Sequence, residues 1–380
     1  MVERPRILSI SFSPLRTDAR VLRQLRLLAE FGDVTSLGFG EAPDGVTEHI
    51  EIPASASLPQ TPGGVLKLAL RRFRAVELGA PAVRAAHAAL AGRSFDLVVA
   101  NEARALPVAF AIAGGAPVWG DMHEWAPEER THVLSWRLLV APFMTWVCAT
   151  YLPRCAAVTT VGGAIAGLYE QRFGVPAEVV RNSIALQDLS PSPLSEGRIR
   201  LVHSGAAVPG RNIEALIAGT LAADRRFTLD LYLVRGGDGG AYWEKLRSLA
   251  AGSDRITFHD AVRPHELPAT LNAYDVGVYS VPLITTNHRY MLPNKFFDFV
   301  QARLAVVFSP SEEIDALIAR LRLGVTSADA SAGALTRTLG SLTSESVAEY
   351  KRNADIAAKG ELNATADDAV VRGILGRLLG

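Results

Sequence analysis

The sequence contains little cysteine and no excess of charge of either sign. Only Cys148 and Cys155 occur among 380 residues, at a spacing that fits neither a disulfide framework nor a metal site, and this usage is typical of a reducing compartment. Lys and Arg number 39 and Asp and Glu number 39, so the formal net charge is zero and the pI is about 7.1. This balance excludes the basic field that nucleic-acid binding requires and a charged disordered arm.

The sequence also lacks a long apolar run. The longest, Leu138–Tyr151, is too short to cross a bilayer, and the opening stretch MVERPRILSISF lacks the apolar core and cleavage site of a signal peptide. We therefore expect a cytoplasmic protein. With Trp136 and Trp146, the run is more typical of a core helix than of a membrane surface, although an apolar acceptor pocket and a peripheral membrane contact are left open.

Apolar runs that fit buried strands alternate with segments of helical spacing along most of the chain. Strands are expected at 7–12, 34–37, 96–100, 117–119, 157–161 and 178–181, and then at 200–203, 227–234, 256–258, 276–279 and 305–308. Helices are expected from the Asp18 cap to Gly32 and at 80–91, 135–152, 165–173, 212–222, 243–251, 294–302 and 364–379. This alternation predicts an α/β protein with doubly wound parallel sheets covered by helices on both faces.

The length predicts two domains of about 150–200 residues each. The polar, proline-punctuated stretch Ala185–Gly197 is the expected linker, which gives domains at 1–184 and 198–360 and a final helix at 361–380 that packs back on the first domain. Open α/β sheets bind ligands beyond the carboxyl ends of their strands. The loops expected to matter are therefore 13–18, 101–104, 120–130, 204–211, 235–240 and 285–295.

The segment LPNKFFDF, Leu292–Phe299, has features of an anion site. Pro293 and Asn294 are helix-start residues, and Lys295 falls in the first turn, where the helix dipole disfavours a cation. A bound phosphate would remove this misfit, because free N–H groups and the ammonium both attract it. Asp298 lies one turn later on the same face and can accept hydrogen bonds from ribose hydroxyls. An ion pair between Lys295 and Asp298 on a solvated face explains the pattern equally well.

A strand end, a glycine-containing loop and a helix start follow one another in HSGAAVPGRNIE, His203–Glu214. Arg211 precedes Asn212, the expected helix cap, and can turn towards a ligand. Arginine pairs with diphosphate oxygens in fork geometry. Taken alone, an ordinary loop with a surface arginine is the simpler interpretation.

The glycine-rich stretch Arg235–Gly240 does not predict a dinucleotide site. Counted from Gly237, the sixth position of a GxGxxG pattern is Tyr242, and no acidic residue closes a second strand of an N-terminal βαβ unit. A nicotinamide-dependent enzyme is therefore not expected.

Titratable residues are dense in WGDMHEWAPEE, Trp119–Glu129, which follows a predicted strand. Asp121, His123 and Glu124 come where that strand ends, at the edge of the sheet that binds ligands. Imidazole is the side chain that ordinarily exchanges a proton near neutral pH. A polar turn with a capping aspartate would have the same composition, so the letters alone leave both interpretations open.

Several segments resemble the GT4-like glycosyltransferases (glycosyltransferase group 1), which have the GT-B fold. The resemblance is carried by FHDAVRPHELPATLNAYDVGVYSVP (Phe258–Pro282), LPNKFFDFVQARLAVV (Leu292–Val307), Thr17–Gly32, Gly210–Ile217 and DMHE, where the family shows D-x-H-E. It covers nearly the whole chain in the family's motif order. It implies two Rossmann-like domains facing across a cleft, the first for the acceptor and the second for a nucleotide sugar.

The resemblance also implies a nucleotide-sugar site. The expected residues are Arg211, Asn294, Lys295, Asp298, His259, Val262, Gly205 and His203. Asp298 stands where the family has a glutamate that holds the donor ribose, and Arg211 and Lys295 match positions that contact the diphosphate. The segment 259–263 falls where backbone groups read the base. The family's other glutamate is replaced by Tyr290, which leaves retention of the anomeric configuration open.

The implied reaction moves a sugar from a UDP, GDP or dTDP sugar to an O, N or S nucleophile. No acidic metal cluster is visible, so no metal and no cofactor are expected, and Arg211, Lys295 and the helix start at Asn294 would stabilise the departing diphosphate. The candidate acceptors include a cell-envelope saccharide, a lipid-linked glycan and a small specialised metabolite. The chain is expected to act as a monomer or homodimer.

Asp121, His123 and Glu124 are the candidate catalytic residues. In an inverting reaction His123 would take the acceptor's proton, with Asp121 orienting it or acting itself. In a retaining reaction a donor phosphate oxygen would take the proton, and His123 would bind the sugar. Two alternatives are a GT-B-fold sugar-nucleotide epimerase, which needs no acceptor, and a non-catalytic sugar-nucleotide binding protein, which Tyr290 would allow.

Overall fold

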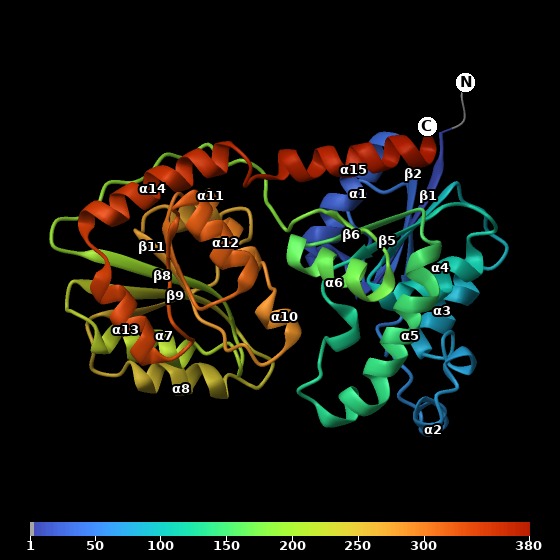
Figure 1. Cartoon of the computed structure of the whole chain (residues 1–380), viewed down its shortest axis with the longest axis horizontal. Helices are drawn as coiled ribbons and strands as arrows, with labels where there is room; N and C mark the ends of the chain where they lie inside the picture. Colours follow the sequence, from blue (N-terminus) through green and yellow to red (C-terminus); the bar gives the residue numbers. More distant parts are fainter. Residues whose placement is uncertain (1–3) are drawn as a thin grey trace. The chain divides into compact units, whose positions relative to one another are not determined.

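The computed structural model describes residues 4–380, which divide into two compact units (Figure 1). The N-terminal unit comprises the chain up to Arg181, the short segment Thr285–Asn287 and the final segment Asp367–Gly380. The C-terminal unit comprises Asn182–Ile284 and His288–Ala366. The expected linker, 185–197, contains neither helix nor strand and belongs to the C-terminal unit. Every helix within the described part of the chain is too short or too polar to span a membrane.

The sheet of the N-terminal unit has seven parallel strands in the order β3-β2-β1-β4-β5-β6-β7. Its strands are β1 (Arg6–Pro14), β2 (Asp33–Phe39), β3 (Glu48–Ile52), β4 (Leu97–Asn101), β5 (Val118–Met122), β6 (Ala157–Thr160) and β7 (Glu178–Val179). Strand order reverses between β1 and β4, and such a switch point opens a crevice at the carboxyl edge of a sheet.

Helices pack against this sheet and bury its apolar side chains. They are α1 (Ala19–Phe31), α2 (Pro62–Ala69), α3 (Pro81–Leu90), α4 (Leu106–Ile112), α5 (Ala141–Tyr151), α6 (Gly163–Phe173) and the last helix, α15 (Ala364–Leu379), with a π-helical turn at Trp136–Val140 before α5. Asp18 caps α1 as predicted, since its side chain accepts from Val21 N at 3.2 Å. Ile374 and Leu375 of α15 are buried in one cluster with Ile7 of β1.

The sheet of the C-terminal unit has six parallel strands in the order β10-β9-β8-β11-β12-β13. They are β8 (Ile199–Ala207), β9 (Phe227–Arg235), β10 (Ile256–Asp260), β11 (Val276–Tyr279), β12 (Ala305–Phe308) and β13 (Gly324–Thr326). The remaining helices are α7 (Ile213–Ala222), α8 (Ala241–Leu249), α9 (Leu267–Leu271), α10 (Thr286–Arg289), α11 (Asn294–Gln301), α12 (Glu312–Leu321), α13 (Ala332–Ser341) and α14 (Ser344–Lys359). Order reverses here between β8 and β11.

The predicted α/β class and parallel sheets are confirmed, and each expected strand and helix is present with shifted ends. The elements that were not predicted include β3, β13, α2, α4, α10 and α12. The strand β3, EHIEI, is half exposed at the sheet edge and lacks the buried-strand pattern. The helix α2 begins Pro-Gly-Gly, a sequence typical of a turn.

A close contact between β11 and α11 fixes the start of α11 relative to the sheet. Gly277 of β11 lies against the ring of Phe299, which is fully buried, and a β-carbon at Gly277 would come within 2.3 Å of that ring. Only glycine therefore allows α11 to pack at this distance. Lys295 and Asp298 belong to the same short helix, so this contact also positions them.

We expect Gly277→Ala to destabilise the protein by about 1–3 kcal/mol, because overpacking a core forces side chains and backbone to shift. Scanning calorimetry would show a lower melting temperature. Gly376→Ala in α15 is the matched control, since a β-carbon there meets no atom within 4 Å and alanine favours a helix. Equal melting temperatures for both variants would contradict the steric argument.

Candidate active site

The carboxyl edge of the C-terminal sheet holds a buried histidine at the strand switch. His203 on β8 donates from Nδ1 to the carbonyl oxygen of Val278 on β11 at 2.9 Å. Burial lowers the pKa of His203 to about 4; the bond to Val278 opposes this shift, and the cations Lys295 and Arg211 add to it. The imidazole is therefore neutral at pH 7, with Nε2 unprotonated.

The last residues of β8 pass directly beside this histidine and Lys295. A β-carbon at Gly205 would lie 3.5 Å from Nε2 of His203 and 3.7 Å from Cε of Lys295. Three of the residues expected in the nucleotide-sugar site are thus brought together by β8 and α11.

Lys295 and Asp298 form the ion pair that the sequence allowed, with Nζ 3.3 Å from Oδ2. Their face is not solvated, because Asp298 is only 8% exposed and the Lys295 side chain 23%. Burial raises the pKa of Asp298, and Lys295 opposes that shift. A charged pair held largely out of water at a helix start is better explained by a binding site than by a surface ion pair.

Arg211, just before α7, lies close enough to His203 and Tyr279 for its charge to act on both side chains. Burial raises the pKa of Tyr279, at the end of β11, and a hydrogen bond from Arg211 opposes the shift. Asn212 does occupy the N-cap position of α7, but the prediction that its side chain caps the helix is wrong. Its backbone is left-handed, with φ of 56°, and its Nδ2 donates to Ser280 Oγ and to the carbonyl oxygen of Ala330 instead.

His259 and Val262 lie apart from this cluster along the sheet edge. His259 is on β10, two strands from β8, which corresponds to about 10 Å at the usual strand spacing. Its ring stacks on Tyr232 with 4.5 Å between centroids, and Nε2 lies 3.3 Å from Oδ1 of Asp230. Val262 follows in the partly exposed loop after β10. This spacing fits a ligand that extends away from the His203–Lys295 cluster.

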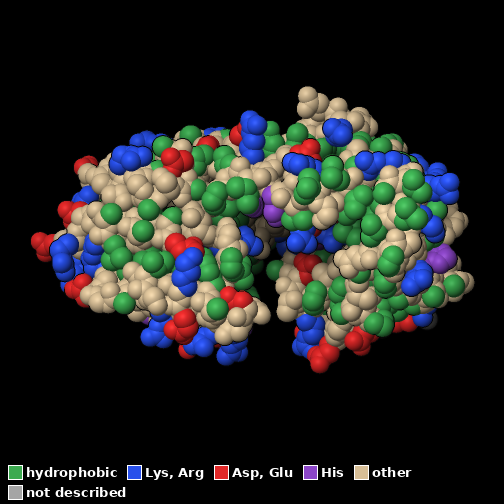
Figure 2. All heavy atoms as spheres, turned by 90° about the horizontal axis from the view of Figure 1, so that it is seen from below, with side chains coloured by type: hydrophobic (Ala, Val, Ile, Leu, Met, Phe, Trp, Pro, Cys, Tyr) green, Lys and Arg blue, Asp and Glu red, His purple; other side chains and the backbone are tan. Residues whose placement is uncertain are grey.

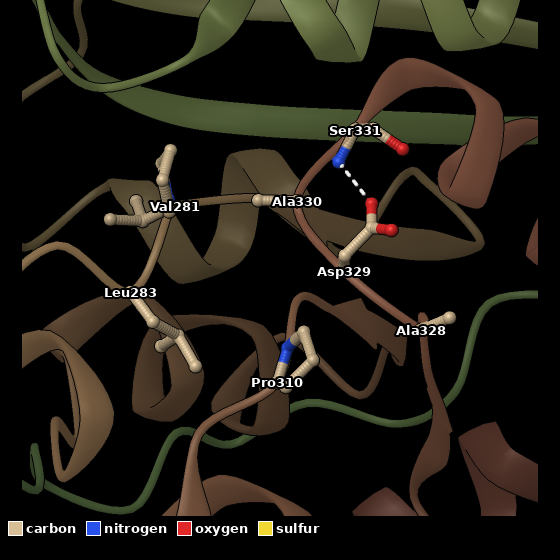
Figure 3. A pocket seen from close by; sticks show the side chains of 8 residues that line it. Val281, Leu283, Pro310, Ala328, Asp329, Ala330 and Ser331 are labelled. Atoms are coloured by element: carbon tan, nitrogen blue, oxygen red, sulfur yellow. Dashed lines mark hydrogen bonds between the residues drawn. The ribbon is translucent and has the colours of Figure 1, made fainter.

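An apolar cavity of about 470 Å³ opens beyond β11, β12 and β13 (Figure 3). Its lining residues are Val281, Pro282, Leu283, Pro310, Ala328, Asp329, Ala330 and Ser331. The carboxylate of Asp329 accepts from the backbone N–H of Ser331 at 2.7 Å and so serves the local turn. The cavity contains none of the residues predicted for the site, although Asn212 is bonded to its wall at Ala330.

In the N-terminal unit, Asp121 of β5 is buried, and both of its carboxylate oxygens accept hydrogen bonds. Arg20 donates to both of its oxygens, at 2.9 and 2.6 Å, Thr159 donates at 2.6 Å, and Gln24 at 3.1 Å. Burial acts to raise the pKa of Asp121, but Arg20 and His123 outweigh it and lower the pKa far below its ordinary value. The carboxylate therefore stays ionised and has little capacity to act as a base itself.

His123 lies between two carboxylates. Nε2 is 3.3 Å from Oδ2 of Asp121, and Nδ1 is 3.7 Å from Oε1 of Glu102. Glu102 follows β4 with φ of 67° and ψ of 157°, a region that is almost restricted to glycine and costs about 1–3 kcal/mol. Strain of this kind at the end of a central strand is typical of a functional site.

Glu124 lies half-buried in a small pocket with other charged groups. The pocket is lined by Glu102, Ala103, Arg104, Met122, His123, Glu124, Ala126, Glu129 and Met144. Burial, followed by the carboxylates of Glu129 and Glu102, raises the pKa of Glu124 to about 8, against the effect of Arg104. Arg104 Nη2 lies 2.9 Å from Glu102 and 3.1 Å from Glu129. Glu124 therefore carries a proton at pH 7.

Asp121, His123 and Glu124 thus lie close to Glu102, Arg104 and Glu129 at this edge of the sheet. The sequence located Glu102 and Arg104 only as part of a loop, and Glu129 only within WGDMHEWAPEE. Their position directly after strand ends was the available signal. No group of three or more His, Cys, Asp or Glu side chains within residues 4–380 is arranged to hold a metal ion.

Comparisons with known proteins match one segment of the N-terminal unit to a family and nearly the whole chain to a known fold. Residues 42–188 match the model of Glycosyltransferase Family 4. A search of curated protein sequences finds no significant match.

Solved structures of the same fold cover nearly all of the chain. HepE of Anabaena, solved in complex with UDP and glucose, has a TM-score of 0.70 at 14% identity over 98% of this chain and 100% of its own. Sucrose-phosphate synthase from Thermosynechococcus elongatus has a TM-score of 0.69 at 15% identity over 99% of both chains. The α,α-trehalose 6-phosphate synthase from Burkholderia multivorans has a TM-score of 0.68 at 12% identity over 99% of both.

The family match and the shared fold confirm the resemblance seen in the sequence. The chain has the GT-B fold of these glycosyltransferase structures, and its residues 42–188 match the model of Glycosyltransferase Family 4.

Proposed function

We propose that this protein is a glycosyltransferase, which takes its sugar from a nucleoside-diphosphate sugar bound by the C-terminal unit and passes it to a nucleophile bound by the N-terminal unit. The observation that carries the proposal is the cluster of Lys295, Arg211 and neutral His203 at the start of α11. HepE, of the same fold, was solved with UDP and with UDP-glucose. A UDP sugar is therefore the first donor to test, followed by GDP and dTDP sugars.

Departure of the diphosphate requires positive charge and N–H donors at the oxygens that gain charge. Lys295 and Arg211 supply two cations, and the first N–H groups of α11 point along the helix dipole. These groups lie together at one edge of the sheet, where they would stabilise the charge that develops on the departing diphosphate. His203 has its Nδ1 proton committed to Val278, so Nε2 would accept from a sugar hydroxyl rather than donate to a phosphate.

The Lys295–Asp298 pair offers a means of sensing the donor. Binding of the diphosphate would draw Nζ of Lys295 away from Asp298, to which it lies 3.3 Å in the absence of a ligand. The carboxylate would then be left to accept from the ribose hydroxyls, as the resemblance implies. Asp298 has one methylene less than the family's glutamate, and its position on α11, set by the Phe299–Gly277 contact, must make up the difference.

On the acceptor side, we assign proton removal to His123 and its orientation to Asp121. Nε2 lies 3.3 Å from the ionised Asp121, which would favour the tautomer with its proton on Nε2 and would leave Nδ1 to take the acceptor's proton. Glu102 lies 3.7 Å from Nδ1, so its carboxylate would stabilise the imidazolium that forms. Glu124, protonated at pH 7, would donate a hydrogen bond to the acceptor. If the reaction retains configuration, His123 binds the sugar instead.

Lys295→Ala is expected to abolish the thermal stabilisation that UDP produces. Charge-assisted hydrogen bonds contribute about 1.5–3 kcal/mol, so affinity should fall at least about tenfold. Differential scanning fluorimetry with UDP, GDP and dTDP would measure the thermal stabilisation by each nucleotide and identify the nucleobase that the site prefers. Lys245→Ala is the control, because Lys245 is an exposed lysine of the same unit paired with Glu214. Comparison without ligand reports any loss of fold, and an intact UDP shift in Lys295→Ala would refute the diphosphate site.

His123→Ala is expected to keep the UDP shift but to slow transfer by about 10²–10⁴, the usual effect of losing a general base. Water can serve as the acceptor, so UDP release from UDP-glucose in a single turnover gives the rate. His87→Ala, which removes an exposed histidine of α3, should behave like the wild type. A wild-type rate in His123→Ala would rule out its role as the base. Conversion of the donor to an epimer without UDP release would instead support an isomerase.

Glu124→Gln is expected to reduce the loss of stability on raising the pH from about 5 to 8. The pKa of Glu124 is raised from 4.5 to about 8 in the folded state, so in this window the folded protein binds more protons than the unfolded chain. The stabilisation that protonated Glu124 provides is complete below the pKa that this residue has in the unfolded chain. It is lost as the pH rises through the pKa of Glu124 in the folded protein. Glutamine cannot ionise. Melting temperatures across this range, with Glu170→Gln on the exposed face of α6 as control, would test it. An unchanged pH dependence in Glu124→Gln would contradict the raised pKa.

A further inference from the structure

Two segments of the N-terminal unit expose large apolar side chains next to each other. Five side chains are involved: Val65 (36% exposed), Leu66 (60%), Leu70 (57%), Leu134 (58%) and Leu138 (55%). The first three lie on α2 or directly after it, and the last two lie in the segment that leads into α5.

These segments are joined, so the exposed side chains form one surface. The turn Trp136–Val140 packs beside α2, and Arg71 Nη1 donates to the carbonyl oxygen of Leu138 at 3.1 Å. Leu68 is the buried side chain of α2, whose remaining apolar residues face outwards. Figure 1 shows α2 at the outer end of this unit.

The same segments carry positive charge without negative charge. Residues 62–76 and 130–140 contain Lys67, Arg71, Arg72, Arg74, Arg130 and Arg137 and no Asp or Glu, in a chain whose charges otherwise balance. All six cations are exposed. Figure 2, which views the side on which α2 lies, shows Lys and Arg among hydrophobic side chains on this unit.

The nearest acidic residues along the chain are turned inwards. Glu77 accepts from the hydroxyl of Tyr151 at 2.5 Å and its side chain is 13% exposed. Glu129 pairs with Arg104 in the Glu124 pocket. Glu77 also pairs with Arg74, at 3.9 Å, but no ion pair within residues 4–380 involves the other five cations. The surface formed by residues 62–76 and 130–140, which we call the basic apolar surface, therefore keeps a positive charge.

We propose that the basic apolar surface docks this chain on a lipid bilayer that contains anionic headgroups. The leucines would enter the boundary between headgroups and acyl chains, as the apolar face of an interfacial helix does. The lysine and arginines would contact lipid phosphates while their stems cover apolar surface. Five cations outside any described ion pair, set around exposed leucines, favour an anionic bilayer over a second copy of this chain, because the same surface on that copy would repel them. The proposal does not depend on the identity of the donor.

Sedimentation with vesicles tests the proposal with the full chain. We expect binding to phosphatidylcholine vesicles that contain phosphatidylglycerol, little binding to phosphatidylcholine alone, and weakening by salt. Each cation near an anionic surface changes partitioning about fivefold, so Lys67→Gln/Arg72→Gln should lower the partition coefficient about 25-fold. Leu66→Gln/Leu70→Gln should weaken binding to both kinds of vesicle.

Leu249→Gln/Ile356→Gln is the matched control, because these side chains are 46% and 70% exposed in the C-terminal unit. It should bind vesicles like the wild type, and an unchanged melting temperature in every variant shows that the fold is intact. Failure of the wild type to bind phosphatidylglycerol vesicles, or equal binding by Lys67→Gln/Arg72→Gln, would overturn the proposal. So would self-association that Leu66→Gln/Leu70→Gln removes without any vesicle binding, since the surface would then join copies of the chain.

Discussion

Parallel strand order is the constraint on which the placement of every functional side chain depends. All strands of each sheet end at one edge, and the order reverses once, between β1 and β4 and between β8 and β11. At the second reversal the ring of His203 bridges to the carbonyl oxygen of Val278 on the neighbouring strand. In the other unit, the backbone N–H of Glu102 after β4 donates to the carbonyl oxygen of Asp121 on β5. In parallel sheets, ligand-binding and catalytic side chains lie at these edges, because backbone groups and helix starts there are able to bind ligands.

The carboxyl edges of the two sheets accommodate buried charge in opposite ways. The C-terminal edge holds Lys295 and Arg211 around a histidine that burial keeps neutral, so positive charge is left over. The N-terminal edge holds more carboxylates than cations, and Glu124 responds by keeping its proton. An excess of cations suits a diphosphate, whereas a mixture of ionised and protonated carboxylates suits hydroxyl groups that must be bound and deprotonated. The contrast is what a reaction between a phosphorylated donor and a polar acceptor requires.

The sequence was sufficient where one short segment determines the structure. Contiguous apolar runs predicted β4, β5, β11 and β12, and residues next to such runs, such as His203 and Asp121, proved to lie together with their expected neighbours. It was insufficient where distant segments meet. The Arg104–Glu129 pair joins two loops, and the strained backbone of Glu102 is held by β5, so neither shows in a local pattern. Asn212 was expected to cap α7, but bonds to residues about 70 and 120 positions later outweighed that local preference.

The apolar run Leu138–Tyr151 was predicted to be a core helix, and most of α5 confirms this, with Phe143, Met144, Val147 and Cys148 buried. Its first residue behaves differently, because Leu138 is 55% exposed beside α2. Met144, six residues later and so about 9 Å along a helix, lines the pocket of Glu124 and Glu129. One continuous helical segment therefore connects the basic apolar surface with the pocket that we assign to the acceptor. If the surface docks on a bilayer as we propose, an acceptor held there would be within reach of that pocket, and among the expected acceptors a lipid-linked glycan is the one that we propose to test first.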